Sequence, residues 1–368
     1  MKVAYIISNL EYAIAFEWIA KEIGDTEIEL SFIFLNPQLP QLASIVQSHG
    51  AKIHFVHYNG KISIPIAILS VWKILKQINP DIIHCHMLDA SVVGLLSGKM
   101  AGVKKRIYTR HHSSFHHVYF PKAVWIDKVC NFLSTNIVAI SRTVEEILLK
   151  EDVDKNKIKL IYHGFELDIF QNINHNQIRV LNEKYNSHHK YPVIGVISRW
   201  TEWKGIQFII PAFKKLLQEY PDAKLLLFNA KGDYVFTINS LLSQLPSNSF
   251  MTIEFESDIK TLYHVFDIFI HTPIDSHSEA FGQTYVESLA SGIPSVFSLS
   301  GIANEFIVNR QNALVVPYQN SDAIFNAITE LLDNKKLSHE IVENGKKDVV
   351  KLFQLKEMIN KLKDLYYE

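Results

Sequence analysis

The sequence predicts an α/β fold with two doubly wound domains, each a parallel sheet covered by helices on both faces. Short apolar runs of strand length alternate with longer segments of helical periodicity, which favours strand–helix–strand units. A polar segment at 171–190, rich in Asn and His, interrupts this series, which then starts again. With 368 residues, the chain is long for one domain and comfortable for two.

The first domain is expected at 1–170, and the polar segment 171–190 is the expected linker region. Apolar runs predict strands at 3–8, 28–35, 52–56, 81–84, 106–109, 136–140 and 158–162. Segments of helical periodicity predict helices at 11–23, 40–49, 65–78, 89–102, 121–133 and 142–150.

The second domain is expected at 191–350, with Pro192 near its start. Its apolar runs predict strands at 193–198, 224–228, 251–255, 267–271, 295–298 and 313–316. Residues 351–368 follow as a C-terminal helix with apolar positions available for packing, namely Met358, Ile359, Leu362 and Leu365.

Composition excludes several classes of protein. Apolar content of 48% and charged content of 20% are typical of a globular protein. The formal net charge of −1 disfavours nucleic acid as a partner. Cys85 and Cys130 alone make neither a disulfide framework nor a four-ligand zinc site. The sequence shows no signal peptide and no apolar stretch of about 18 residues, so a cytoplasmic protein is expected.

The strongest functional signal runs from His271 to Pro294, between two expected strands. Glu279 lies in the loop before a helical pattern, and Glu287 lies one turn inside it. Backbone N–H groups at 282–285 offer an anion site at the helix start. Glu279 before this anion site and Glu287 behind it suit a nucleotide sugar. The hydroxyls of such a ligand would bind the two carboxylates, and its phosphates would bind the N–H groups. Alternatively, Thr284 and Glu287 form a capping box, in which Glu287 bonds back to the helix start.

This stretch resembles the two-glutamate signature of retaining GT-B glycosyltransferases, and more narrowly of family 4. The resembling letters are EAFGQTYVESLASGIP at 279–294, and the resemblance is strong over 193–318 and weaker before. It implies two Rossmann-like domains facing across a cleft, with the last helix, 351–368, crossing back to the first domain. It also implies that Glu279 contacts the donor sugar and Glu287 the ribose. Backbone donors to the sugar and diphosphate then come from Phe281, Gly282, Gln283 and Thr284.

Two cations follow the first strand of the second domain, Arg199 and Lys204. Basic residues in a loop are usually only solvated, but family 4 enzymes bind the donor diphosphate with an Arg and a Lys-Gly at this place. With these cations and the helix start, we expect no metal. Asp152-Val153-Asp154 spells the Asp-x-Asp of metal-dependent glycosyltransferases, but its charged surroundings indicate a solvated turn.

Histidines mark the first domain. Residues 108–112, which end in His111 and His112, resemble the family segment Thr-x-His, whose His faces the transferred sugar; His111 aligns best and His112 is the alternative. His86 matches a family pattern on the acceptor side, where Asn9 and Glu11 are further candidates, although their loop lacks the usual glycine pair. Histidine pairs at 84/86 and 116/117 indicate no metal site, because no carboxylate stands at ligand spacing.

A basic segment with interleaved aromatic residues, 99–128, leaves two interpretations open. Its cations are Lys99, Lys104, Lys105, Arg106, Arg110, Lys122 and Lys128, and its aromatic residues include Tyr119, Phe120 and Trp125. They are either solvated ends of strands and helices, or a docking patch for anionic lipid or a lipid-linked pyrophosphate acceptor.

We therefore expect a retaining, metal-independent hexosyltransferase that uses a UDP- or GDP-linked sugar and no other cofactor. His111, Glu279, Arg199 and Lys204 are the catalytic candidates. The expected acceptor is a glycan or a lipid-linked glycan, in surface polysaccharide or lipopolysaccharide assembly at the inner face of the membrane. The alternatives are a nucleotide-sugar epimerase of the same architecture and a non-catalytic nucleotide-sugar-binding protein. A dehydrogenase is disfavoured, because no Gly-x-Gly-x-x-Gly follows the first strand.

Overall fold

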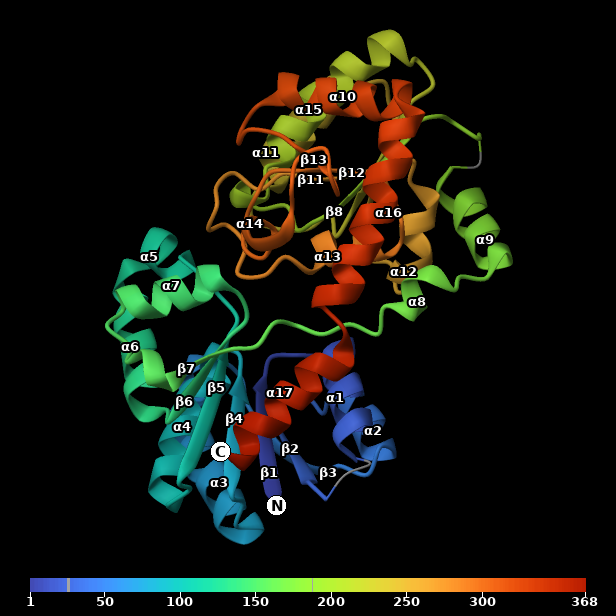
Figure 1. Ribbon diagram of the computed structural model, residues 1–368. Coiled ribbons are helices and arrows are strands. Elements are labelled where there is room, and N and C mark those ends of the chain that lie inside the picture. The colour runs from blue at the N-terminus through green and yellow to red at the C-terminus, as the bar shows by residue number, and fades with distance from the viewer. Residues whose placement is uncertain (25–26, 187) are drawn as a thin grey trace. The chain divides into compact units, whose positions relative to one another are not determined.

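The computed structural model describes residues 1–24, 27–186 and 188–368. The chain forms two compact units, coloured by residue number in Figure 1. The first unit comprises Met1–Phe165 and Leu355–Glu368, and the second comprises Glu166–Gln354. Both are parallel sheets covered by helices. The predicted fold class is confirmed, including the return of the last helix to the first domain.

The first unit is built on a seven-stranded parallel sheet of order β3-β2-β1-β4-β5-β6-β7. Its central strands are apolar runs buried on both faces, as parallel strands between helical layers require. The order reverses between β1 and β4, which makes a topological switch point. The strands are β1 (Lys2–Ser8), β2 (Glu29–Asn36), β3 (Lys52–His57), β4 (Ile82–His86), β5 (Lys105–Arg110), β6 (Asn136–Ala139) and β7 (Ile158–Leu160).

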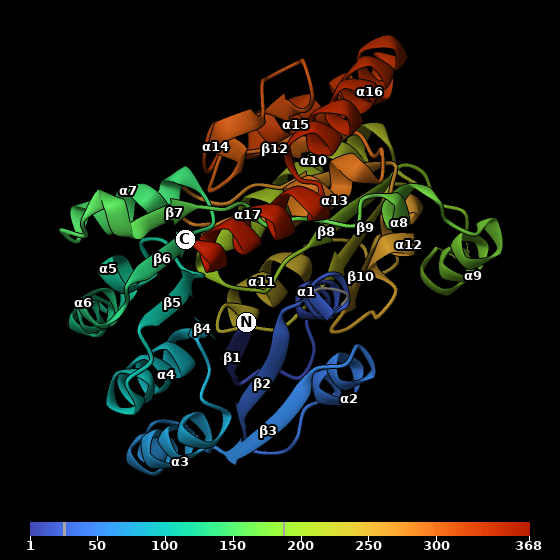
Figure 2. The same ribbon diagram turned by 60° about the horizontal axis from the view of Figure 1, so that its bottom comes forward.

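Helices cover both faces of this sheet (Figure 2). One face carries α1 (Ile14–Gly24), α2 (Gln41–Ser48) and α17 (Leu355–Tyr367). The other carries α3 (Ile64–Ile78), α4 (Leu88–Ala101), α5 (Phe115–Tyr119), α6 (Val124–Leu133) and α7 (Arg142–Lys150). The helix expected at 121–133 begins only at Val124, after a 3-10 turn, and α5 was not predicted.

Two close approaches fix helices to the first sheet. A Cβ on Gly94 of α4 would lie 2.5 Å from Sγ of Cys85 in β4, so only glycine lets the helix approach this closely. On the other face, the hydroxyl of Tyr366 in α17 lies 2.5 Å from that of Tyr5 in β1 and 2.7 Å from Nδ1 of His84. All three groups are buried, so α17 is an integral part of this unit.

The second unit contains a six-stranded parallel sheet of order β10-β9-β8-β11-β12-β13. Its strands are β8 (Val193–Ile197), β9 (Lys224–Phe228), β10 (Phe250–Ile253), β11 (Ile268–His271), β12 (Ser295–Phe297) and β13 (Leu314–Val315). Its helices are α8 (Asp168–Gln171), α9 (His175–Tyr185), α10 (Ile206–Glu219), α11 (Val235–Leu242), α12 (Ile259–Leu262), α13 (Gln283–Ala290), α14 (Ala303–Phe306), α15 (Ser321–Asp333) and α16 (Lys335–Leu352).

The polar segment expected as the linker region, 171–190, contains α9, which packs against α12 of the second unit. Residue 187 of this segment lies outside the described residues. The second unit begins at Glu166.

Candidate active site

The second unit gathers charged side chains where two neighbouring strands end. Glu279 lies in the loop between β11 and α13, and Lys204 ends a 3-10 turn that follows β8. Because β8 and β11 are adjacent and parallel, their carboxyl ends meet at one sheet edge. Nζ of Lys204 donates to Oε1 of Glu279 at 2.5 Å, and Nε2 of His271 lies 2.9 Å from the same oxygen.

The charge state of Glu279 is set by these two neighbours. Burial alone would raise the pKa of its carboxyl, but Lys204 and His271 lower the pKa to about 2. Burial lowers the pKa of His271, which favours its neutral form. At neutral pH Glu279 is therefore a buried carboxylate paired with Lys204, and it can accept hydrogen bonds from ligand hydroxyls.

Glycines allow the close contacts at this site. Gly205 has φ +74°, and a Cβ there would lie 1.9 Å from the carbonyl oxygen of Thr272. Gly282 has φ +89°, and its Cβ would meet the ring of Tyr285 at 2.6 Å. Both positions require glycine, which explains the Lys-Gly and Phe-Gly pairs of the sequence.

Gly282 is also the N-cap of α13, and among the described residues no side chain caps this helix end. The helix start therefore offers the backbone N–H groups of Gln283 and Thr284 to an anion. Tyr285 differs from the expectation, because its N–H donates to the carbonyl of Gly282 at 3.2 Å. Phe281 is buried and its ring packs edge-on against Phe353, so its side chain belongs to the core.

The capping-box alternative for Glu287 is wrong. Oε2 of Glu287 accepts a hydrogen bond of 2.7 Å from the hydroxyl of Tyr263, and the N-cap of the helix is Gly282 rather than Thr284. Burial raises the pKa of Glu287 above its ordinary value. Arg199 follows β8 with an exposed side chain.

In the first unit, histidines converge at the ends of β4 and β5. Nδ1 of His86 lies 3.1 Å from Nε2 of His111, and the ring of His111 stacks on His163 with centroids 5.8 Å apart. Burial lowers the pKa of His111 to about 3 and that of His163 to about 4, so both are neutral at physiological pH. Sequence reasoning missed His163, although it directly follows the last expected strand.

Other acceptor-side candidates already hold local structure. Nδ2 of Asn9 donates to Oδ2 of Asp89 at 3.0 Å. Oε1 of Glu11 accepts the backbone N–H of Gln41 at 3.0 Å, which caps the start of α2.

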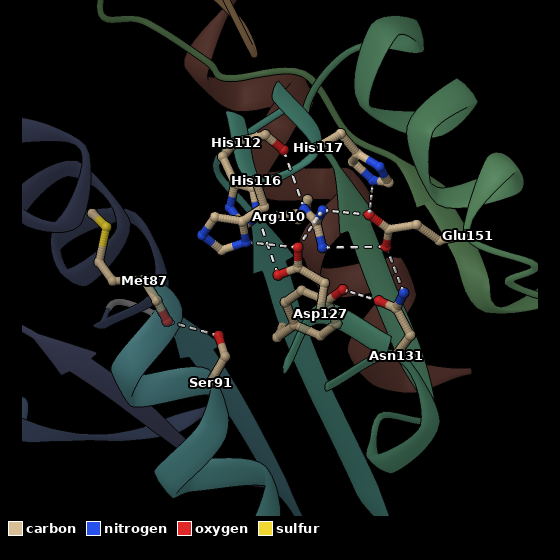
Figure 3. Close-up of polar contacts among 10 residues, drawn as sticks. Met87, Ser91, Arg110, His112, His116, His117, Asp127, Asn131 and Glu151 are labelled. Atoms are coloured by element: carbon tan, nitrogen blue, oxygen red, sulfur yellow. Dashed lines mark hydrogen bonds and ion pairs between the residues drawn. The ribbon is translucent and has the colours of Figure 1, made fainter. Parts of the chain in front are cut away.

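His112 does not join His111; it faces a separate polar cluster around Arg110 (Figure 3). Arg110 is 1% exposed and pairs with Asp127 at 3.1 Å and with Glu151 at 2.7 Å. The expectation that Arg110 belongs to a surface patch is therefore wrong, because these two buried carboxylates hold it inside. A pocket of about 290 Å³ opens beside it, lined among others by His111, His112 and His116.

Asp152 and Asp154 lie at a solvated turn, as predicted. The side chain of Asp152 is 90% exposed, and Asp154 caps the following 3-10 turn by accepting the N–H of Asn156 at 2.9 Å.

Comparisons with known proteins agree with this arrangement. Residues 19–169 match the family described as Glycosyltransferase Family 4, and residues 177–348 match Glycosyl transferases group 1. The chain therefore belongs to the GT-B glycosyltransferases, with a family 4 domain followed by a group 1 domain.

Individual relatives cover most of the chain. It is 27% identical to the capsular polysaccharide biosynthesis glycosyltransferase CapM of Staphylococcus aureus, over 88% of each chain. It is 24% identical to the UDP-Gal:alpha-D-GlcNAc-diphosphoundecaprenol alpha-1,3-galactosyltransferase of Escherichia coli, over 82% of this chain and 79% of that one. The structure of Anabaena HepE in complex with UDP-glucose superposes with a TM-score of 0.84 at 20% identity, covering 100% of this chain and 99% of that one.

Proposed function

We propose that the protein transfers a hexosyl group, with retention of configuration, from a nucleotide sugar to a glycan or lipid-linked acceptor. The observation that carries this proposal is the buried Lys204–Glu279 pair beside the uncapped start of α13. A cation, a carboxylate that accepts hydrogen bonds from hydroxyls, and backbone N–H donors thus lie at one sheet edge. These groups together suit the binding of a nucleotide sugar.

Each charged group has a role in the proposed transfer. Arg199, Lys204 and the N–H groups of α13 bind the donor diphosphate and stabilise its charge as it departs. Glu279 accepts hydrogen bonds from the sugar, and Glu287 accepts them from the ribose. Together the cations and the helix start neutralise the diphosphate, so this step needs no metal ion.

The chemistry proceeds on one face of the sugar. The bond between the anomeric carbon and the diphosphate oxygen breaks, and the acceptor oxygen bonds to the anomeric carbon from the same side. The acceptor proton passes to the departing diphosphate. His111, whose lowered pKa keeps it neutral, serves as a hydrogen-bond partner of the transferred sugar rather than as a charge.

Relatives support the choice of substrates. The E. coli relative's name gives UDP-galactose as donor and a diphosphoundecaprenol-linked sugar as acceptor. The name of CapM refers to capsular polysaccharide. We therefore propose a UDP-linked donor ahead of a GDP-linked one, and surface polysaccharide assembly, which includes lipopolysaccharide, as the setting.

We further propose that the first unit contacts the cytoplasmic face of an anionic membrane. Large apolar side chains are exposed on α5, α6 and the turn between them, namely Val118, Phe120, Trp125 and Phe132. Exposed Lys99, Lys104, Lys122 and Lys128 accompany them, and Nζ of Lys99 lies over the Phe132 ring. Such a mixture suits a lipid headgroup surface. Among the described residues, no helix has the length and apolar character to cross a membrane.

This proposed lysine surface is narrower than the basic segment 99–128. Arg106 donates to the backbone oxygens of Leu133 and Val103, and Lys105 is only partly exposed. Arg110 is buried, as described above. Of the remaining lysines, Lys128 pairs with Asp152 at 3.6 Å, so Lys99, Lys104 and Lys122 are the ones proposed to face lipid.

The function is tested with a panel of UDP- and GDP-linked hexoses. We expect one of the UDP sugars to raise the melting temperature, to be hydrolysed slowly without acceptor, and to give a product of unchanged anomeric configuration by NMR with an acceptor. An inverted product contradicts the retaining mechanism. Rapid conversion of one nucleotide sugar into another without acceptor indicates an epimerase. Stabilisation without any turnover indicates a binding protein.

A further inference from the structure

We infer that His112, His116 and Asp127 of the first unit form a binding site for one divalent transition-metal ion of the Zn²⁺ class. The three side chains come from the loop after β5, from α5 and from α6, and they converge on one point beside Arg110 (Figure 3). One ligand atom from each lies within 4.8 Å of those of the other two. This inference is independent of the donor site, which lies in the second unit.

The distances suit shared coordination. Nε2 of His112 lies 3.2 Å from Oδ1 of Asp127. Nδ1 of His116 forms a hydrogen bond of 2.7 Å with Oδ2, which coordination of the ion by Nδ1 would replace. Ligands at about 2.0–2.2 Å from a tetrahedral zinc ion lie roughly 3.3 Å from one another. The pocket of about 290 Å³ beside the cluster leaves space for a fourth ligand such as water.

Two of the ligand atoms are buried without a hydrogen bond. Within the described ranges, neither Nε2 of His112 nor Oδ1 of Asp127 has a hydrogen-bond partner, although the two atoms lie within ion-pair distance of each other. Buried polar atoms in this state are uncommon and costly, and a cation between them would satisfy both.

Outer contacts hold the proposed ligands in place. Nη2 of Arg110 donates to Oδ2 of Asp127 at 3.1 Å, which leaves Oδ1 for the ion. Glu151 fixes Arg110 in turn, and Glu151 accepts hydrogen bonds from Asn131 at 2.8 Å and from His117 at 2.9 Å. Partners of this kind orient the ligands in metal sites.

The charge of the cluster favours a divalent cation. Buried Asp127 and Glu151 together carry one more charge than Arg110 neutralises. Two imidazoles and one carboxylate suit Zn²⁺, whereas Mg²⁺ and Ca²⁺ prefer oxygen ligands. Protonation of a histidine is the competing way to balance the charge, and direct metal titration separates the two. An ion bound here would tie β5, α5 and α6 together.

The test is a titration of the full-length, metal-free protein with Co²⁺ as a spectroscopic probe, followed by competition with Zn²⁺. We expect one equivalent of Co²⁺ to give visible ligand-field bands, Zn²⁺ to displace it, and Zn²⁺ to raise the melting temperature. His112→Gln and His116→Gln should each weaken binding at least about tenfold. His117→Gln is the comparison variant, because it removes a neighbouring imidazole that contacts Glu151 and not Asp127, so it should weaken binding less than either ligand variant does.

Three outcomes would overturn the site. The first is no binding by wild type at tens of micromolar metal. The second is equal affinity of wild type and His112→Gln. The third is equal weakening by His117→Gln and His112→Gln. The His112 side chain is 22% exposed, so its replacement should leave the fold intact. Should a variant fail to fold, X-ray absorption of the zinc-loaded wild type decides: two imidazole ligands support the site, and three or more point to the His86–His111–His163 group instead.

Discussion

Lys204 and Glu279 lie 75 residues apart in the chain, yet Nζ of Lys204 contacts Oε1 of Glu279 at 2.5 Å. The pair is mostly buried, with side chains 15% and 10% exposed. Each charge therefore depends on the other. In the proposed transfer, a donor diphosphate that pairs with Lys204 would also change the hydrogen bonding of Glu279, so diphosphate binding and sugar binding would be coupled.

Lys204→Ala should lower both kcat/KM and stability. Loss of a preorganised cation costs about 2–4 kcal/mol in transition-state stabilisation. The buried Glu279 also loses its counter-charge, which costs about 3 kcal/mol in folding. Arg199→Ala is the matched control, because its exposed side chain should affect kcat/KM similarly and leave the melting temperature unchanged. Wild-type turnover by either variant, at saturating and subsaturating donor, contradicts this placement of the diphosphate.

Glu287→Gln should weaken nucleotide binding by roughly tenfold, since a charge-assisted hydrogen bond becomes a neutral one. The melting temperature should change little, because the glutamine oxygen still accepts from Tyr263. Calorimetric titration with UDP gives the affinity. Tyr263→Phe is the companion variant, which frees the carboxylate without removing its charge. Unchanged affinity alongside lost stability would assign Glu287 a structural role only.

Glu279 should make stability depend on acid. Its pKa falls from 4.5 to about 2 on folding, so the unfolded chain binds the proton more tightly. The stabilisation is complete above about pH 4.5 and is lost as pH falls towards about 2. The free energy of unfolding of wild type and Glu279→Gln should therefore converge as pH falls through this range. Parallel curves would show that Glu279 is not a buried, paired carboxylate.

A chelator should leave sugar transfer largely unchanged, because in the proposed mechanism Arg199, Lys204 and the start of α13 neutralise the diphosphate without a metal ion. The same treatment should lower the melting temperature of zinc-loaded protein, through the His112–His116–Asp127 site. Transfer rates at 25 °C and thermal melts, each with and without EDTA, separate the two effects. Complete loss of transfer that Mn²⁺ or Mg²⁺ restores would contradict the metal-independent donor site.

Lys99, Lys104 and Lys122 replaced together by Gln should release the protein from anionic vesicles. Each exposed lysine near a lipid surface contributes roughly 1 kcal/mol, and salt screens these charges within about 10 Å at 0.1 M. Vesicle co-sedimentation at low and physiological salt measures the change. A triple Gln variant at exposed Lys336, Lys347 and Lys351 of the second unit is the control. If wild type stays in solution at low salt, the surface has no lipid role.

Local patterns predicted the fold well, and two of the residues proposed for the donor site, Lys204 and Glu279, lie in contact. Strands such as β1 and β8 are buried on both faces. Their sequences are continuous apolar runs, which can be recognised without the structure. Lys204 and Glu279 meet because the ends of parallel strands β8 and β11 lie at one edge of the sheet. The resemblance of 279–294 to the two-glutamate signature had indicated this proximity.

Contacts between distant side chains could not be predicted. Arg110 resembled its basic neighbours, but its counter-charges Asp127 and Glu151 lie 17 and 41 residues further on. The carboxylate beside His112 and His116 was missed for the same reason, since Asp127 belongs to the next long helix. The local sequence around Asp127 does not show that its side chain lies on the buried side of α6.

The buried bond between Tyr5 and Tyr366 also bears on the order in which the protein is made. The first unit needs α17, which is synthesised after Glu166–Gln354, the one continuous stretch that forms the second unit. Domains generally fold as units during synthesis, so the second unit can be finished while the first still exposes the face that α17 will cover. Residues 1–165 are synthesised before the second unit, yet their unit is completed after it.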